Sequence, residues 1–181
     1  MPISNDYVVA ALRTYLDVHP GEADALAPLL ALAREQSPVT ARATLSGHVT
    51  CGAVGIAPDG RVVQIHHRTL NTWLLPGGHV EPTDTSLLAA AVREFSEETG
   101  MSPHSLRPIQ TIPIDIDAHT VPENPAKNEP GHTHYDFRFA FSLSAGLIQL
   151  QLAEVTSFRW TSAGDLNGRL RTRVPASGVA P

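Results

Sequence analysis

Residues 74–100, LLPGGHVEPTDTSLLAAAVREFSEETG, join a short apolar strand, a glycine loop and a helix within one stretch of sequence. The strand ends at Pro76, and Gly77 and Gly78 allow the backbone that follows to approach other groups closely. A helical pattern then runs to Gly100, a residue that commonly ends helices, and its candidate N-caps are Asp84, Thr85 and Ser86. This order predicts that loop backbone and helix side chains meet at one place.

The end of the predicted helix carries three acids. Glu94, Glu97 and Glu98 stand at i, i+3 and i+4 and therefore share a face, while Arg93 lies one turn before Glu97 and is expected to pair with it. Like charges at this spacing cost about 0.2–0.5 kcal/mol per pair, and the helix dipole disfavours anions in the last turn. A bound divalent cation would offset both costs, and a solvated acidic face is the alternative.

The opposite side of this helix is apolar and is expected to pack on a sheet. Its members are Leu88, Ala91, Val92, Phe95 and Thr99. Strands are predicted at 48–56, 61–68, 107–121, 133–143 and 155–161, with a short final helix near Asp165. Strands on both sides of a helix indicate a mixed α/β sandwich.

The domain organisation predicted from these patterns has three parts. Residues 1–42 form a helical appendage with two helices, residues 43–170 form the main domain, and residues 171–181 form a flexible tail. The appendage is expected to pack against the main domain, with a substrate lid or a dimer contact as the alternatives.

Composition limits the function classes. The chain has 181 residues and a net charge of -5, so a large nucleic-acid footprint is not expected. Cys51, the single cysteine, lies in an apolar run and is interpreted as a core residue. The sequence shows neither a signal peptide nor a long apolar run, which favours a cytoplasmic protein.

The stretch 78–101 resembles the sequence box of the Nudix hydrolases, G-x5-E-x7-R-E-x-x-E-E-x-G followed by an apolar residue. The matching positions with intact spacing are Arg93, Glu94, Glu97, Glu98, Gly100 and Met101. Asp84 departs from the pattern, because it replaces a glutamate and is separated from Arg93 by one residue more than the box has. The extra residue is expected within 83–86, and the resemblance extends over residues 46–168.

This resemblance implies a Nudix-type α-β-α sandwich with a mixed sheet that hydrolyses a nucleoside diphosphate linked to another group. It implies Mg²⁺ or Mn²⁺ bound by Glu94, Glu98 and the Gly77 carbonyl, with Glu97 as a ligand of a second ion or an assisting group. Arg93 would hold a glutamate in place. The general base stays open between Glu94 and a carboxylate or histidine from another loop.

Further pocket candidates lie outside the box. His132, His134 and Asp136 alternate along a predicted strand and so point to one side, which suits a metal or phosphate contact at the rim, with a structural role as the alternative. His79 follows the glycines and is a second candidate. Arg68 and Arg138 are candidates for phosphate, Trp73 and Tyr135 for base stacking or core packing, and Glu154 for a rim acid. The histidines expected to be structural are His19, His48, His104 and His119.

The expected substrate is a small nucleotide-type molecule, with no membrane or extended nucleic-acid partner and with a homodimer left open. The alternative function is a non-catalytic Nudix-like sensor that binds a nucleotide, although a sensor has no need of Glu94, Glu97 and Glu98. An isomerase on the same fold is disfavoured, because no cysteine lies near the glycine loop in the sequence.

Overall fold

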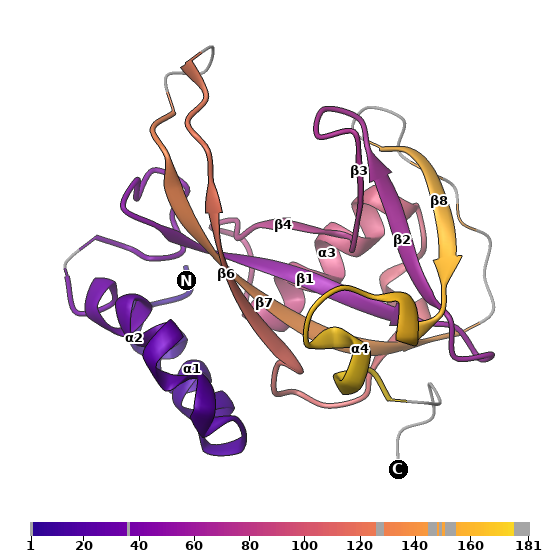
Figure 1. Ribbon diagram of the computed structural model, residues 1–181, viewed down its shortest axis with the longest axis horizontal. Coiled ribbons are helices and arrows are strands. Elements are labelled where there is room, and N and C mark those ends of the chain that lie inside the picture. Colours follow the sequence, from indigo (N-terminus) through magenta and orange to yellow (C-terminus); the bar gives the residue numbers. More distant parts are fainter. Residues whose placement is uncertain are drawn as a thin grey trace.

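The computed structural model describes residues 2–35, 37–125, 129–144, 148, 150 and 155–175 (Figure 1). The helical elements are α1 (Asn5–Val18), η1 (Pro20–Glu22), α2 (Ala23–Leu32), α3 (Leu87–Thr99), η2 (Pro103–Ser105), η4 (Ala163–Asp165) and α4 (Leu170–Arg173). The strands are β1 (His48–Ile56), β2 (Val62–His67), β3 (Thr72–Leu74), β4 (Gly77–His79), β5 (Leu106–Pro108), β6 (Asp115–Val121), β7 (His132–Leu143) and β8 (Val155–Thr161).

Within the described residues, eight strands form one mixed sheet in which β1 and β7 run side by side and parallel. The main path is β3-β2-β1-β7-β5, while β4 pairs with β1, β6 with β7 and β8 with β2. The register aligns His48 with His134 and Thr50 with Asp136. Since paired residues point to the same side, this register decides which side chains meet on the sheet.

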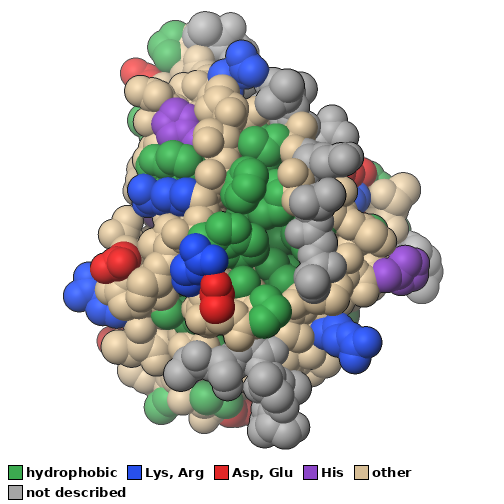
Figure 2. Space-filling view, turned by 90° about the vertical axis from the view of Figure 1, so that its right-hand side faces the viewer, with side chains coloured by type: hydrophobic (Ala, Val, Ile, Leu, Met, Phe, Trp, Pro, Cys, Tyr) green, Lys and Arg blue, Asp and Glu red, His purple; other side chains and the backbone are tan. Residues whose placement is uncertain are grey.

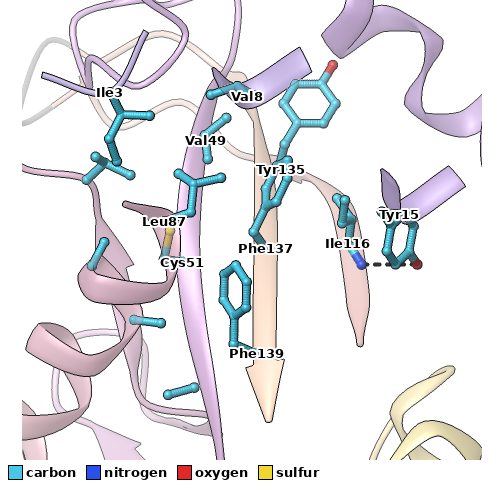
Figure 3. Packing of buried hydrophobic residues seen from close by; sticks show 14 of the residues in the cluster. Ile3, Val8, Tyr15, Val49, Cys51, Leu87, Ile116, Tyr135, Phe137 and Phe139 are labelled. Carbon is cyan, nitrogen blue, oxygen red and sulfur yellow. Dashed lines mark hydrogen bonds between the residues drawn. The ribbon is translucent and has the colours of Figure 1, made fainter. Parts of the chain in front are cut away.

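Helices cover both faces of the sheet, which confirms the predicted α/β sandwich. Val49 and Cys51 of β1 belong to a buried cluster with residues of α1, α2 and α3, whereas Val54 and Ile56 belong to a second cluster with Leu170 of α4. Figure 3 shows α1, α3, β1 and β7 contributing to the first cluster through Val8, Leu87, Cys51 and Phe137. The predicted appendage therefore shares its core with the main domain.

The side of the molecule formed by β2, β3 and β8 carries a gathering of apolar side chains on its surface (Figure 2). The exposed large apolar residues here are Leu70 in the turn between β2 and β3, Leu74 of β3 and Phe158 of β8. No helix that the structure describes is both long enough and apolar enough to cross a membrane.

Helix α3 follows its predicted signals. Ser86 is the N-cap, and its hydroxyl oxygen accepts a hydrogen bond from the Ala89 N–H at 3.0 Å. Gly100 ends the helix in the left-handed conformation, with φ 67°, which is why glycine suits this position. The residues upstream of Ser86 lie in a loop, so one additional residue fits there without changing the helical register of the acids.

Two regions differ from the sequence-based expectation. The strand expected at 107–121 is interrupted, because residues 109–114 loop out opposite residues 139–140 of β7 between the β5 and β6 pairings. The flexible tail expected at 171–181 is wrong for its first residues, since residues 171–173 belong to α4 and Leu170 and Val174 are buried against the sheet. Residues 176–181 and Glu154 lie outside the described residues.

Candidate functional site

Arg93 organises the end of α3. Its Nη1 donates to Oε1 of Glu94 and to Oε2 of Glu97, both at 3.0 Å, which confirms the predicted pairing with Glu97. Its Nη2 donates to the His79 carbonyl at 2.8 Å, and Nε and Nη2 donate to Asp84. These five bonds use all five N–H groups of a guanidinium. Arg93 therefore positions its neighbours and has no donor left for another molecule.

Asp84, the residue that departs from the family pattern, is the main partner of Arg93. Its two carboxylate oxygens accept from Nε and Nη2, each at 3.0 Å, and Oδ2 also accepts from the Glu81 N–H at 2.7 Å. Asp84 is 6% exposed, so the pair is largely shielded from water. The hydrogen bond to Asp84 raises the pKa of Arg93. Asp84 thus fastens the loop before α3 to the helix.

Glu98 is buried rather than solvated. Its Oε2 accepts a hydrogen bond from the Gly77 N–H at 2.9 Å, and the residue is 7% exposed. In an extended strand the N–H and C=O of one residue point to the same side, so the Gly77 carbonyl also faces Glu98. The loop backbone and the helix carboxylate consequently meet, as the order of elements predicts.

Gly78 lies against Glu94. A Cβ atom added to Gly78 would lie 2.7 Å from the carboxylate carbon and from both carboxylate oxygens of Glu94, so the absence of a side chain makes room for this acid. Burial raises the pKa of the Glu94 carboxyl, and the charge of Arg93 opposes this rise without cancelling it. A buried acid of this kind is stabilised as a carboxylate by a nearby cation.

Glu97 completes the acidic group at its solvent side. Its side chain is 57% exposed, against 15% for Glu94. The three acids therefore differ in exposure, with Glu98 against Gly77, Glu94 against Gly78 and Glu97 toward solvent. Such an all-oxygen donor set is what hard divalent cations prefer.

Four of the histidines converge at another place. The structure brings His79, His132 and His134, which are the candidates from the sequence, together with His48, for which the sequence predicts a structural role. Ring centroids of His48 and His134 lie 4.7 Å apart. The missed residue belongs to β1, and the β1–β7 register that places it beside His134 joins residues far apart in sequence. No local pattern carries that signal.

Asp136 lies one step along the same side of the sheet from His134, beside Thr50. It accepts from the Thr50 hydroxyl at 3.1 Å and from Arg138 Nε at 2.8 Å. Arg138 also donates to Asp115 and Asp117. Three carboxylates therefore occupy Arg138, which argues against its role as a phosphate ligand.

The remaining candidates are dispersed. Arg68 lies in the exposed turn between β2 and β3. Tyr135 is buried in the core, and the Arg159 guanidinium lies 4.5 Å from the centre of a Trp73 ring. Neither aromatic ring is therefore freely open to a base.

Cys51 corrects one element of the sequence interpretation. The β1–β4 pairing sets Cys51 opposite Gly78, so a cysteine does lie near the glycine loop. The residue is fully buried, and burial raises the pKa of its thiol well above the usual value. A buried, protonated thiol is unreactive, which leaves the isomerase interpretation without support.

Comparison with known proteins assigns most of the chain. A family model described as NUDIX domain matches residues 47–178. A probable DHNTP pyrophosphohydrolase of Lactococcus lactis subsp. cremoris (strain MG1363) is 37% identical over 100 residues, which are 55% of this chain and 56% of that protein. The chain thus matches about half the length of this relative.

Similar solved structures include the dihydroneopterin triphosphate pyrophosphohydrolase of E. coli, at 22% identity and a TM-score of 0.49, over 64% of this chain and 80% of that one. A MutT NUDIX hydrolase from Burkholderia pseudomallei is 21% identical with a TM-score of 0.49, over 71% and 92% of the two chains.

Proposed function

We propose that this chain, which belongs to the Nudix family by its match to the NUDIX domain over residues 47–178, is a divalent-metal-dependent hydrolase. Its reaction would cleave the pyrophosphate bond of a nucleoside diphosphate linked to another group. The single observation that carries this proposal is the meeting of Glu94 and Glu98 with the backbone of Gly77 and Gly78.

The residues fit a hard cation such as Mg²⁺ or Mn²⁺. Oxygen ligands are available from Glu94, Glu97, Glu98 and the Gly77 carbonyl. Burial raises the pKa of Glu94, so a nearby cation would stabilise its carboxylate form. When bound, such ions neutralise the charge of a pyrophosphate and activate a water molecule. The proposal assigns Glu94 and Glu98 with Gly77 to the first ion, and Glu97 to a second ion or to assistance.

The protein's own contribution is positioning. Arg93 holds Glu94 and Glu97 in fixed directions through its Nη1 group, so the carboxylates need little reordering when an ion or substrate arrives. Glu94 is the candidate general base within this group, with a residue from another loop as the alternative. His79, Arg68, His132, His134 and Asp136 remain candidates for substrate contact.

The test is a substrate panel assayed with Mg²⁺ and with Mn²⁺. It contains ADP-ribose, dinucleoside polyphosphates, nucleotide sugars, oxidised dNTPs and dihydroneopterin triphosphate, the last because the Lactococcus relative is named for it. We expect metal-dependent release of phosphate products from at least one member. Glu97→Gln and Glu98→Gln should abolish that release while thermal stability stays near normal or rises.

A non-catalytic sensor would behave differently in the same assay. It would bind a nucleotide, measured by calorimetry, without hydrolysing any member of the panel. Full turnover in both glutamine variants would likewise contradict the assignment of the acids to catalysis.

A further inference from the structure

His48, His79 and His134 come from β1, β4 and β7 and form a compact group. Each can offer one ring nitrogen such that these atoms all lie within 4.8 Å of one another. They line a cavity of about 110 Å³, with His132 and an Arg42–Glu129 ion pair at its rim. The group thus combines several nitrogen ligands with space for an ion.

One ring nitrogen of His48, Nε2, has a lone pair with no hydrogen-bond donor among the described residues. Its Nδ1 lies 3.3 Å from the Thr44 carbonyl oxygen, and because a carbonyl only accepts, Nδ1 must carry the proton. In the neutral ring, Nε2 is then an acceptor. Nε2 is buried and has no hydrogen-bond partner within the part of the chain that the structure describes. Leaving such an atom unsatisfied costs about 1–3 kcal/mol, and a cation would remove this cost.

A second pair of ring nitrogens lies at hydrogen-bonding distance. His132 donates from Nδ1 to the Pro130 carbonyl at 2.9 Å, so its Nε2 is also an acceptor when the ring is neutral, and it lies 3.1 Å from Nε2 of His134. A neutral His134 that carries its proton on Nε2 donates to His132, and its Nδ1 is then an acceptor. Two imidazoles on one tetrahedral ion, with metal–nitrogen bonds of about 2.0–2.1 Å, have nitrogens about 3.3 Å apart.

Neutral imidazole is the form of histidine that binds metals. The Thr44 carbonyl that holds His48 is an outer-shell partner of the kind that fixes the ring of a metal-binding histidine.

We propose that His48, His79 and His134 bind one first-row transition-metal ion of the Zn²⁺, Co²⁺ or Ni²⁺ class, at a site separate from the carboxylates of α3. Imidazole suits these ions, whereas Mg²⁺ prefers oxygen ligands. His132 also lines the cavity and can supply a fourth nitrogen ligand. The argument for this site uses the histidine geometry alone, and its test does not depend on hydrolase activity.

The experiment titrates metal-stripped full-length protein with Co²⁺ in the presence of excess Mg²⁺, which occupies oxygen sites. We expect one equivalent of Co²⁺ to bind and to give the visible absorption of a nitrogen-ligated ion with low coordination number. Changes to outer-shell partners alone cost 10–100-fold in metal affinity. His48→Gln and His134→Ala, which remove ligands, should therefore weaken binding by at least about 100-fold.

Two matched controls separate this site from others. Exposed His104 lies outside the group, so His104→Gln should bind Co²⁺ like the wild type. Glu97→Gln should also bind normally, because it alters only the carboxylate site. Circular dichroism of the metal-free variants verifies that they are folded, and His79→Gln serves where another variant fails to fold. Absence of stoichiometric Co²⁺ binding by the wild type would overturn the proposal, as would unchanged binding in all folded histidine variants.

Discussion

Asp84 and Arg93 face each other through two parallel hydrogen bonds, from Nε to Oδ1 and from Nη2 to Oδ2, each 3.0 Å long. The family box has a glutamate in place of Asp84 and one residue fewer before the arginine. The shorter side chain of Asp84 and the longer loop before Arg93 therefore occur together, and both affect the contact between these two residues. The structure resolves the question raised by the sequence, since Asp84 is an anchor of the loop.

Asp84→Asn should destabilise the protein. The amide removes one charge of a largely buried two-point pair and replaces one of the two oxygens that accept from Arg93 by a donor. Breaking such a pair costs about 3 kcal/mol, measured as the change in the free energy of unfolding in urea. The matched control is Asp59→Asn, since Asp59 and Arg61 form a pair whose side chains are about half exposed. Equal effects of the two substitutions would contradict the anchoring role.

Gly78→Ala should reduce activity far more than stability. The added methyl group would lie 2.7 Å from the Glu94 carboxylate, so that acid must move. A displacement of about 1 Å of a catalytic group costs on the order of 100-fold in rate, measured as kcat with the substrate found in the panel. Gly21→Ala is the control, because nothing lies within 4 Å of a Cβ at Gly21. Normal kcat in Gly78→Ala would show that Glu94 needs no such space.

Stability should fall as the pH rises from about 10 to about 12, because of Tyr15. Burial, followed by the hydrogen bond that Tyr15 donates to Glu22, raises the pKa of this phenol from 10.0 to about 12. In that window the unfolded tyrosine loses its proton while the folded one keeps it, so the folded state binds more protons and loses stability with rising pH. A two-unit shift corresponds to at most about 3 kcal/mol.

The comparison for Tyr15 is Tyr15→Phe, followed by urea unfolding at several alkaline pH values. The variant loses the hydrogen bond to Glu22, which is 2.8 Å long, and should be less stable at pH 8. Its stability should then depend less steeply on pH above 10. Parallel pH profiles for the two proteins would refute the assignment of this dependence to Tyr15.

Removal of residues 1–42 should prevent folding. Val8, Leu12, Leu26 and Leu29 of this segment are fully or almost fully buried in the same cluster as Tyr135 of β7, so their loss exposes apolar surface of the sheet. Arg173 of α4 also pairs with Glu22 of η1 and with Asp115 of β6. Circular dichroism and thermal unfolding of the shortened protein check this. A cooperative transition like that of the full chain would mean that residues 43–181 fold alone.

Features that depend on neighbours in sequence could be predicted. The glycine loop, the helix that ends at Gly100 and the pairing of Arg93 with Glu97 all follow from spacing, because helix geometry relates residues three and four positions apart. The burial of Glu98 could not be predicted in this way, since it depends on the Gly77 N–H.

The histidine group shows most clearly what local sequence patterns cannot predict. Alternation along one strand identified His132 and His134, but His48 joins them only through the parallel β1–β7 pairing. The proximity of Cys51 to Gly78 arises in the same way from the β1–β4 pairing. Strand register is set by the whole core rather than by any local pattern, so these meetings require the folded structure.

His79 takes part in both the histidine group and the hydrogen bonding of Arg93. Its ring lies in the histidine group, 5.1 Å from His48 between ring centroids, while its carbonyl holds the arginine that orients Glu94 and Glu97. One residue, His79, therefore contacts both the proposed transition-metal site and the arginine beside the proposed catalytic ions. Binding free energies linked in this way are reciprocal: whatever a nitrogen-bound ion does to the affinity for Mg²⁺, Mg²⁺ must do to the affinity for that ion.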